Sequence, residues 1–248
     1  MAEWRYLRGW TESELSRRLE DASSLRLNFS LKEKKTPERG WNHVRSRALI
    51  AYEDRGAPVE GDTFGRLWRS VEKFEHSDPR IVIAHFREAV PFSQRSLLLE
   101  LRALGLRYLC PAKVGASHVE SNLDATVHCF AVDTLEGHIE RGREWFILEK
   151  DHATGEIQFH IEAAWRAGDF PNRWSRAGFH LVGRRYQRAW HRLAHLRLRR
   201  LAAGLEPHAQ IGPQGVAHEG PSLPTAPVQF FAQQHLGGRQ LQVEERED

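Results

Sequence analysis

The chain has 248 residues, of which 40% are hydrophobic and 28% charged, and its formal net charge is +3 at pH 7. This length can bury a substantial core, and the composition is typical of a globular domain in solution rather than a fibrous or disordered chain. The first residues lack the apolar core of a signal peptide, no apolar run approaches the ~20 residues that span a bilayer, and the two cysteines form no CxxC pair. We therefore expect a cytoplasmic protein without a transmembrane segment, a disulfide framework or a zinc site.

The first third of the chain predicts two helices. Thr11 and Glu14 have the spacing of a capping box, in which each side chain satisfies a backbone N–H of the other residue at a helix start. A second helix is expected to begin at Asp62 or Thr63, since either side chain can accept a hydrogen bond from the first helical turn. Its buried face is marked by apolar residues at helical spacing: Phe64, Leu67, Trp68, Val71 and Phe74.

Between and after these helices the pattern favours strands. Strands are expected over 44–52 and 81–84, followed by two extended segments that are broken near Gly105. A DHATGE hairpin loop precedes a strand over 157–165, in which apolar and polar side chains alternate. One apolar and one polar face indicate an antiparallel sheet with one side in water. The strand that begins at residue 125 is expected to line its apolar face with Ala125, Val127, Cys129 and Ala131.

The C-terminal part predicts a long helix over about 174–202, in which Gly178 and Gly183 either weaken the first turns or allow another backbone to approach closely. These elements predict an α+β fold in which a curved antiparallel sheet grips a long C-terminal helix. We expect one domain over 1–202. Residues 203–248 hold six acidic residues against two arginines and are rich in Gly, Pro and Gln. They are predicted to be a disordered acidic tail, with a short ordered patch at PVQFF left open.

The segment GHIERGRE, residues 137–144, is the strongest candidate for a site. His138 could act as a general base or bind a ligand, with Glu140 or Glu144 orienting its ring. The alternative is a charged connection between two strands, in which Gly137 and Gly142 supply unusual backbone angles. The sequence places no nucleophile, metal-ligand triad or phosphate-binding loop beside this segment, which favours the connection. If Glu144 is instead buried in the sheet, it needs a polar partner, and Arg184 and Gln187 from the long helix are the candidates.

The long helix is strongly basic, and no acidic residue occurs between Asp169 and Glu206. A one-sided run of this kind could bind nucleic-acid phosphates or an anionic lipid surface, or it could be paired with acidic residues elsewhere, including the tail. The candidate surface consists of Arg184, Arg185, Arg188, Arg192 and Arg197. His191 and His195 share a helix face at a spacing that can bind metal, but no third ligand accompanies them, so no metal site is predicted.

Several segments occur in the order found in a known family: FGRLWRSVEKFEHSDPRIV, RSLLLELRALGLRYL, TLEGHIERGREWFIL, ATGEIQFHIEAAWR and GFHLVGRRYQRAW. On these residues the chain resembles the uncharacterised DUF1990 family over roughly residues 62–200. The most specific element is TLxGHxExGxExF, and one departure is AAWRAGDFP, where many members carry Ser-Arg-Pro after the last strand. The pattern is also similar to the START-like (SRPBCC) helix-grip superfamily, which implies an apolar cavity between sheet and helix. The matching positions are Thr134, Leu135, Gly137, His138, Glu140, Gly142, Glu144 and Phe146.

The sequence and this resemblance together predict a protein that binds a small apolar or amphipathic molecule between the sheet and the long helix, without a cofactor. His138, Glu144, Tyr186 and Gln187 would orient the ligand. Two alternatives remain open. One is an enzyme that uses the same pocket for acid–base chemistry on a polyketide-like or lipid-like substrate, with His138, Glu140 or Glu144 as candidates. The other is a binder of nucleic acid or anionic lipid. The predicted ligand-binding residues are Val127, Cys129, Phe159, Ile161, Tyr186 and Gln187.

Overall fold

The computed structural model describes residues 3–103, 105–205 and 226–231, without the side chains at positions 180 and 182. Its centre is one antiparallel sheet with the strand order β3-β4-β5-β6-β7-β8-β2-β9. Strand β1 pairs with the N-terminal end of β5. Most of the predicted tail lies outside the described residues. The strands are β1 (Glu3–Tyr6), β2 (Asn42–Tyr52), β3 (Val82–His85), β4 (Ser96–Ala103), β5 (Leu106–Ser121), β6 (Ala125–Thr134), β7 (Glu140–Asp151), β8 (Glu156–Ala167) and β9 (Gln229–Phe231).

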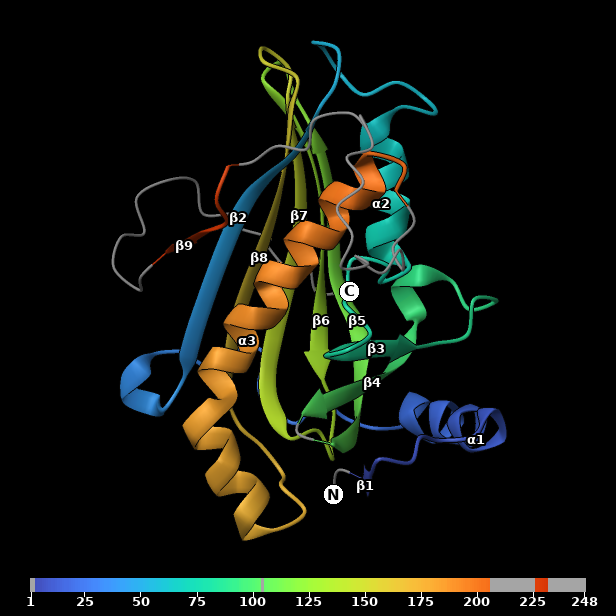
Figure 1. Cartoon of the computed structure of the whole chain (residues 1–248), viewed down its shortest axis with the longest axis vertical. Coiled ribbons are helices and arrows are strands. Elements are labelled where there is room, and N and C mark those ends of the chain that lie inside the picture. Colours follow the sequence, from blue (N-terminus) through green and yellow to red (C-terminus); the bar gives the residue numbers. More distant parts are fainter. Residues whose placement is uncertain (1–2, 104, 206–225, 232–248) are drawn as a thin grey trace, which may run out of the picture.

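Three α-helices pack on this sheet: α1 (Glu12–Ser23), α2 (Thr63–Glu72) and the long α3 (Arg173–Ala202). In Figure 1, α3 runs diagonally across one face of the sheet, and α2 lies near its C-terminal end. The predicted α+β architecture, in which a curved antiparallel sheet grips a long C-terminal helix, is confirmed. Within the described residues, no helix combines the length and apolarity needed to cross a membrane.

Both predicted N-terminal helix caps are present. The Thr11 hydroxyl accepts a hydrogen bond from the backbone N–H of Glu14, and the Glu14 carboxylate accepts one from the N–H of Thr11. Asp62 caps α2 by accepting from the N–H of Gly65 at 2.7 Å. These bonds satisfy donors that the first turn of a helix otherwise leaves unpaired.

A buried ion pair fixes α2 to the sheet. The Glu53 carboxylate accepts a hydrogen bond from the N–H of Thr63 at 2.9 Å, at the start of the helix. The same carboxylate lies 2.8 Å from the ammonium of Lys150, a residue that is almost completely buried. A negative charge at a helix N-terminus is stabilising, and the lysine compensates for the burial of that charge.

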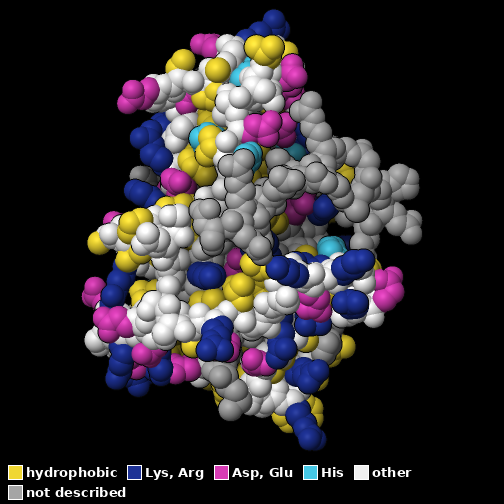
Figure 2. Space-filling view, turned by 180° about the vertical axis from the view of Figure 1, so that it is seen from behind, with side chains coloured by type: hydrophobic (Ala, Val, Ile, Leu, Met, Phe, Trp, Pro, Cys, Tyr) yellow, Lys and Arg dark blue, Asp and Glu magenta, His cyan; other side chains and the backbone are white. Residues whose placement is uncertain are grey.

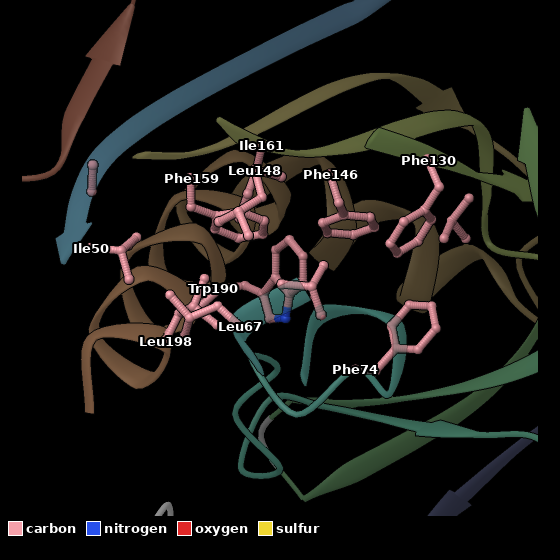
Figure 3. Close-up of a cluster of buried hydrophobic side chains, with 14 of the residues drawn as sticks. Ile50, Leu67, Phe74, Phe130, Phe146, Leu148, Phe159, Ile161, Trp190 and Leu198 are labelled. Atoms are coloured by element: carbon pink, nitrogen blue, oxygen red, sulfur yellow. The ribbon is translucent and has the colours of Figure 1, made fainter. Parts of the chain in front are cut away.

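The main core lies between the helix-facing side of the sheet, α2 and α3. Three central strands contribute Phe130, Phe146 and Phe159, and the ring of Phe146 lies between the other two and contacts Trp190 of α3 (Figure 3). Phe130 and Phe146 are paired across β6 and β7, and Phe146 is paired with Ile161 across β7 and β8. Because side chains alternate between the two sides of a strand, the residues between these positions point away from α3.

The other side of the sheet is mixed in character. Its residues include basic and acidic side chains such as Arg45 and Glu162, which form an ion pair at 3.1 Å. Figure 2 shows that basic and acidic side chains are interspersed over the face turned away in Figure 1. This side does not present a surface of one charge sign.

Strand β9 extends the sheet beyond β2, and the short ordered patch left open at PVQFF is therefore present. Arg199 of α3 holds the segment by donating to the carbonyl oxygen of Ala226 at 2.7 Å, and it also donates to that of Leu49 at 2.8 Å. Phe230 stacks on the ring of His191 with 6.3 Å between ring centroids. The C-terminal segment therefore covers one edge of the contact between β2 and α3.

Candidate ligand pocket

A pocket of about 370 Å³ lies between the N-terminal half of α3 and the ends of β4, β5 and β7. Most of its lining is apolar, and among the described residues that line it Glu140 is the one with a charged side chain. Such a combination of apolar walls and a few polar groups is typical of small-molecule sites. The apolar walls come mainly from Leu101, Leu106, Tyr108, Phe170, Phe179 and Tyr186.

Two glycines on α3 leave this space open. Gly178 and Gly183 both line the pocket, and a Cβ at Gly178 would meet no atom within 4 Å. A glycine in a helix interior costs stability relative to alanine, so two of them here weaken the helix where they widen the pocket. Both glycines are unusual in the sequence of a helix, but their spacing alone did not predict that they line a pocket.

Glu140 is the first residue of β7, and its side chain reaches toward α3. Both carboxylate oxygens accept from the side-chain amide of Gln187, at 3.2 and 3.3 Å. The pKa of Glu140 is raised to about 7, mainly by burial; the Gln187 hydrogen bond opposes this rise, and the nearby charge of Glu144 adds to it. Glu140 is therefore a carboxyl group that can change its charge near neutral pH inside an apolar pocket.

The hydroxyl groups of the pocket are largely committed to the protein. The Tyr186 hydroxyl accepts from the backbone N–H of Arg102 at 3.2 Å and lies 2.7 Å from the carbonyl oxygen of Ile81, to which it can donate. Tyr108 donates to the hydroxyl of Ser175 at 2.9 Å. Burial raises the pKa of Tyr186, so this phenol stays protonated.

His138 lies in the turn before β7, and it does not line the pocket. It is almost fully buried, and its Nδ1 accepts from the backbone N–H of Glu140 at 2.9 Å. A neutral ring therefore carries its proton on Nε2, which has no hydrogen-bond partner among the described residues. Burial lowers the pKa of His138 to about 3. His138 supports the backbone at the start of β7, and its geometry does not suit a general base for a bound ligand.

The predicted GHIERGRE site is thus divided between a turn and a strand. The turn is short, with Gly137 at φ +90° and the His138 N–H donating to the carbonyl oxygen of Leu135. Residues 140–144 belong to β7, so Glu140 and Glu144 are strand residues. Gly142 does not supply a positive φ, as the connection hypothesis proposed; it allows β8 to approach closely.

Glu144 belongs to a second polar group, a chain of hydrogen bonds between β7, β2 and α3. The Glu144 carboxylate lies 3.2 Å from Nε2 of His191. Nδ1 of His191 lies 2.8 Å from the hydroxyl of Ser46, and the same hydroxyl lies 2.8 Å from Nε2 of His195. The partner of Glu144 is therefore His191, whereas the sequence suggested Arg184 or Gln187.

With a neutral His191 ring, one arrangement of protons satisfies this chain. His191 donates from Nε2 to Glu144, so its Nδ1 accepts from the Ser46 hydroxyl, whose oxygen accepts from Nε2 of His195. If the hydrogen bonds ran in the opposite direction, Nε2 of His191 would be unprotonated, and its lone pair would face the carboxylate of Glu144. Burial lowers the pKa of His195 to about 2, with smaller electrostatic contributions from neighbouring groups that include Arg199, which keeps its ring neutral.

The order serine–histidine–glutamate is that of a nucleophile, a base and an orienting acid. However, Ser46 is only 2% exposed and lies in the middle of β2 beneath α3, where both imidazole rings already contact its hydroxyl. His191 and His195 are fully buried. This chain fixes α3 to the sheet and gives no access to a substrate.

Replacing Ser46 with alanine is expected to lower the free energy of unfolding by about 1–3 kcal/mol, because it leaves a buried donor of His195 and a buried acceptor of His191 unpaired. Urea denaturation of the full chain measures this change. Ser23→Ala at an exposed position is the control and should stay within about 0.5 kcal/mol of wild type. A fluorophosphonate probe should leave Ser46 unmodified; labelling at Ser46 would contradict the structural role.

The other predicted ligand-binding residues fall into two groups. Phe159 and Ile161 face α3 as expected, but both are completely buried in the closed core and do not line the pocket. Val127 and Cys129 are on the opposite side of the sheet, since Cys129 is paired with Ile147 while the neighbouring Phe130 packs in the core. Contrary to the prediction, Val127 and Cys129 therefore do not line a pocket between the sheet and α3.

Two of the five arginines of the predicted basic surface on α3 make hydrogen bonds within the protein. Arg184 donates to the side-chain oxygen of Asn42 at 3.0 and 2.7 Å, and the half-buried Arg197 donates to the carbonyl oxygen of Glu75. Arg184 nevertheless remains exposed, as are Arg185, Arg188 and Arg192. The basic surface on α3 therefore stays a prediction.

The long helix held across an antiparallel sheet, with a pocket between them, defines a helix-grip domain. The model of the domain of unknown function DUF1990 matches residues 27–195, and the chain belongs to this family. The match begins before the region of roughly 62–200 on which the resemblance was first based, so it includes β2 and the loop that precedes it. No curated protein matches the sequence.

Solved structures similar to this chain share little sequence with it. A hypothetical protein from Helicobacter pylori has a TM-score of 0.39 and 12% identity, covering 70% of this chain and 98% of its own. Ara h 8.0201 has a TM-score of 0.37 and 10% identity, covering 64% and 98%. Major latex-like protein 151 from Panax ginseng has a TM-score of 0.34 and 13% identity, covering 60% and 97%.

Proposed function

We propose that this protein is a cytoplasmic binder of a small apolar or amphipathic molecule, held between the N-terminal half of α3 and the ends of β4, β5 and β7. The observation that carries this proposal is the pocket itself, which is large, mainly apolar and widened by Gly178 and Gly183. Residues near its polar end, Glu140 with Gln187 behind it, would orient the ligand. Tyr186 forms part of the wall.

Filling the pocket tests this proposal. Gly178→Phe is expected to weaken binding of the neutral probe N-phenyl-1-naphthylamine at least about tenfold, because the new ring takes up space that the probe needs. The substitution should not lower the stability of the helix, since glycine is the poorest helix former after proline. Probe fluorescence, titrated against the full chain, measures the affinity.

Ala177→Phe is the matched control, because Ala177 is exposed on the same helix and does not line the pocket. Its affinity for the probe should equal that of wild type. If Gly178→Phe binds the probe as tightly as wild type does, the binding site must lie elsewhere in the protein. If wild type binds neither the probe nor any member of a library of neutral apolar compounds, the proposed function fails.

An acid–base enzyme that uses the same pocket is the second candidate, and one observation favours it. Glu140 lines the pocket and has a pKa raised to about 7, the range in which a carboxyl group transfers protons efficiently at neutral pH. His138 would not take part, because its ring is enclosed in the turn before β7. The electrostatic alternative has weaker support, since Arg184 and Arg197 are bound to neighbouring segments.

A further inference from the structure

The charge of Glu140 has no counter-ion among the described residues. Its hydrogen-bond partner is the uncharged amide of Gln187. Two arginines on neighbouring segments are engaged elsewhere: Arg141 pairs with Asp169 at 2.7 Å, and Arg102 binds Glu100 at 2.7 Å. An unpaired carboxylate in an apolar environment is costly, so a bound cation there would remove a large penalty.

Around Glu140 the pocket offers more capacity to accept hydrogen bonds than to donate them. An ionised carboxylate has room for about four hydrogen bonds, and Glu140 receives one amide group shared between its two oxygens. The Tyr186 hydroxyl hydrogen is directed at backbone carbonyl oxygens, and that of Tyr108 is directed at Ser175. A ligand that donates hydrogen bonds therefore fits this end better than one that accepts them.

Building on the proposed function, we propose that the pocket is selective for apolar amines, and that the protonated amine of the ligand pairs with the Glu140 carboxylate while the apolar part lies against the walls. An apolar acid is rejected because it would place a second anion beside Glu140 in a medium of low dielectric constant. A neutral alcohol can donate one hydrogen bond and should rank between the two.

The pH dependence follows from the charge of Glu140. The pKa of Glu140 is about 7, so below pH 7 the carboxyl group must lose a proton before it can pair with an ammonium group. Amine affinity should therefore be about tenfold weaker at pH 6 than at pH 8, and alcohol affinity should change little. The titratable groups around Glu140 are Glu144 on β7, Tyr186 on α3, Cys110 and Tyr108 on β5, and His138 in the preceding turn.

The test compares three ligands with the same apolar chain: decylamine, decanol and decanoic acid, each at submicellar concentration. Displacement of N-phenyl-1-naphthylamine from the full chain at pH 8 should give at least about tenfold tighter binding for decylamine than for decanol, with decanoic acid weakest. In Glu140→Gln, which preserves the shape of the side chain, decylamine should weaken about tenfold or more. Decanoic acid should bind no more weakly than it does to wild type.

Glu144→Gln is the control for a general change of charge, since Glu144 does not line the pocket. It should keep the amine preference. Decanol that binds as tightly as decylamine in wild type, or an amine preference that survives in Glu140→Gln, would overturn the selectivity while leaving ligand binding intact. Failure of all three compounds to bind wild type would instead count against the pocket as a ligand site.

Discussion

Acidification is expected to destabilise this protein steeply, by about 2–3 kcal/mol for each pH unit between about pH 6 and pH 5. Three histidines are responsible, because each is buried and neutral in the fold. Burial lowers the pKa of His76 and His138 to about 3 and that of His195 to about 2, from an ordinary value of 6.5. Below pH 6.5 the unfolded chain takes up protons at these residues and the folded chain does not, so stability that is present above pH 6.5 is lost as the pH falls.

Glu140 opposes this trend. Its pKa is raised from 4.5 to about 7, so between these values the folded protein binds a proton that the unfolded chain does not bind. Glu140 therefore adds stability as the pH falls from 7 to 4.5. Three histidines against one glutamate leave a net uptake of about two protons on unfolding, and each proton corresponds to about 1.4 kcal/mol per pH unit.

Urea denaturation of the full chain at pH 7.5, 6.0 and 5.0 measures this slope. His76→Leu should reduce it by about 1.4 kcal/mol per pH unit, because His76 is surrounded by aromatic rings and neither ring nitrogen has a hydrogen-bond partner among the described residues. Ser23→Ala, which removes no titratable group at an exposed position, should leave the slope unchanged. Stability that stays constant from pH 7.5 to pH 5.0 would contradict the prediction.

The sequence predicted most of the elements because their patterns are strong. The apolar face of α2 and the alternation of β8 each admit one interpretation, since the periods of 3.6 and 2 differ clearly there. Strand β6 is different, because both of its sides are apolar. Phe130 and Val132 lie on one side, and Cys129 and Ala131 lie on the other. Period alone cannot decide which side meets α3. The larger side chains fill the space under the helix, and the small ones pack on the far side.

The candidate site was predicted in part. Glu140 and Gln187 were both singled out from the sequence, but their contact joins residues 47 positions apart and depends on how α3 crosses the sheet. The pocket walls on β4 and β5 were missed for the same reason. The pairing of Glu144 with His191 also depends on this crossing, because it requires a known position of α3 along the sheet.

The most specific motif of the chain, residues 134–146, is explained largely by the close contact of β7 with β8. A Cβ at Gly142 would clash with the carbonyl oxygen of Ala164 and lie 2.8 Å from the Cα of Trp165. The N–H of Gly142 also donates to the hydroxyl of Thr134 at 2.8 Å, so the backbone cannot easily shift away. Gly142→Ala is therefore expected to lower the free energy of unfolding by about 3 kcal/mol, the upper end of the usual range for overpacking in a core.

Gly178→Ala is the matched control, since it adds the same methyl group where no atom lies within 4 Å. It should stabilise α3 by up to about 1 kcal/mol. Urea denaturation of both variants at pH 7.5 separates a clash from a general effect of replacing glycine. If Gly142→Ala unfolds at the same urea concentration as wild type but fails to bind ligand, the motif acts directly in the site. Loss of stability instead assigns Gly142 to the sheet and leaves Glu140 as the residue of the motif that faces the ligand.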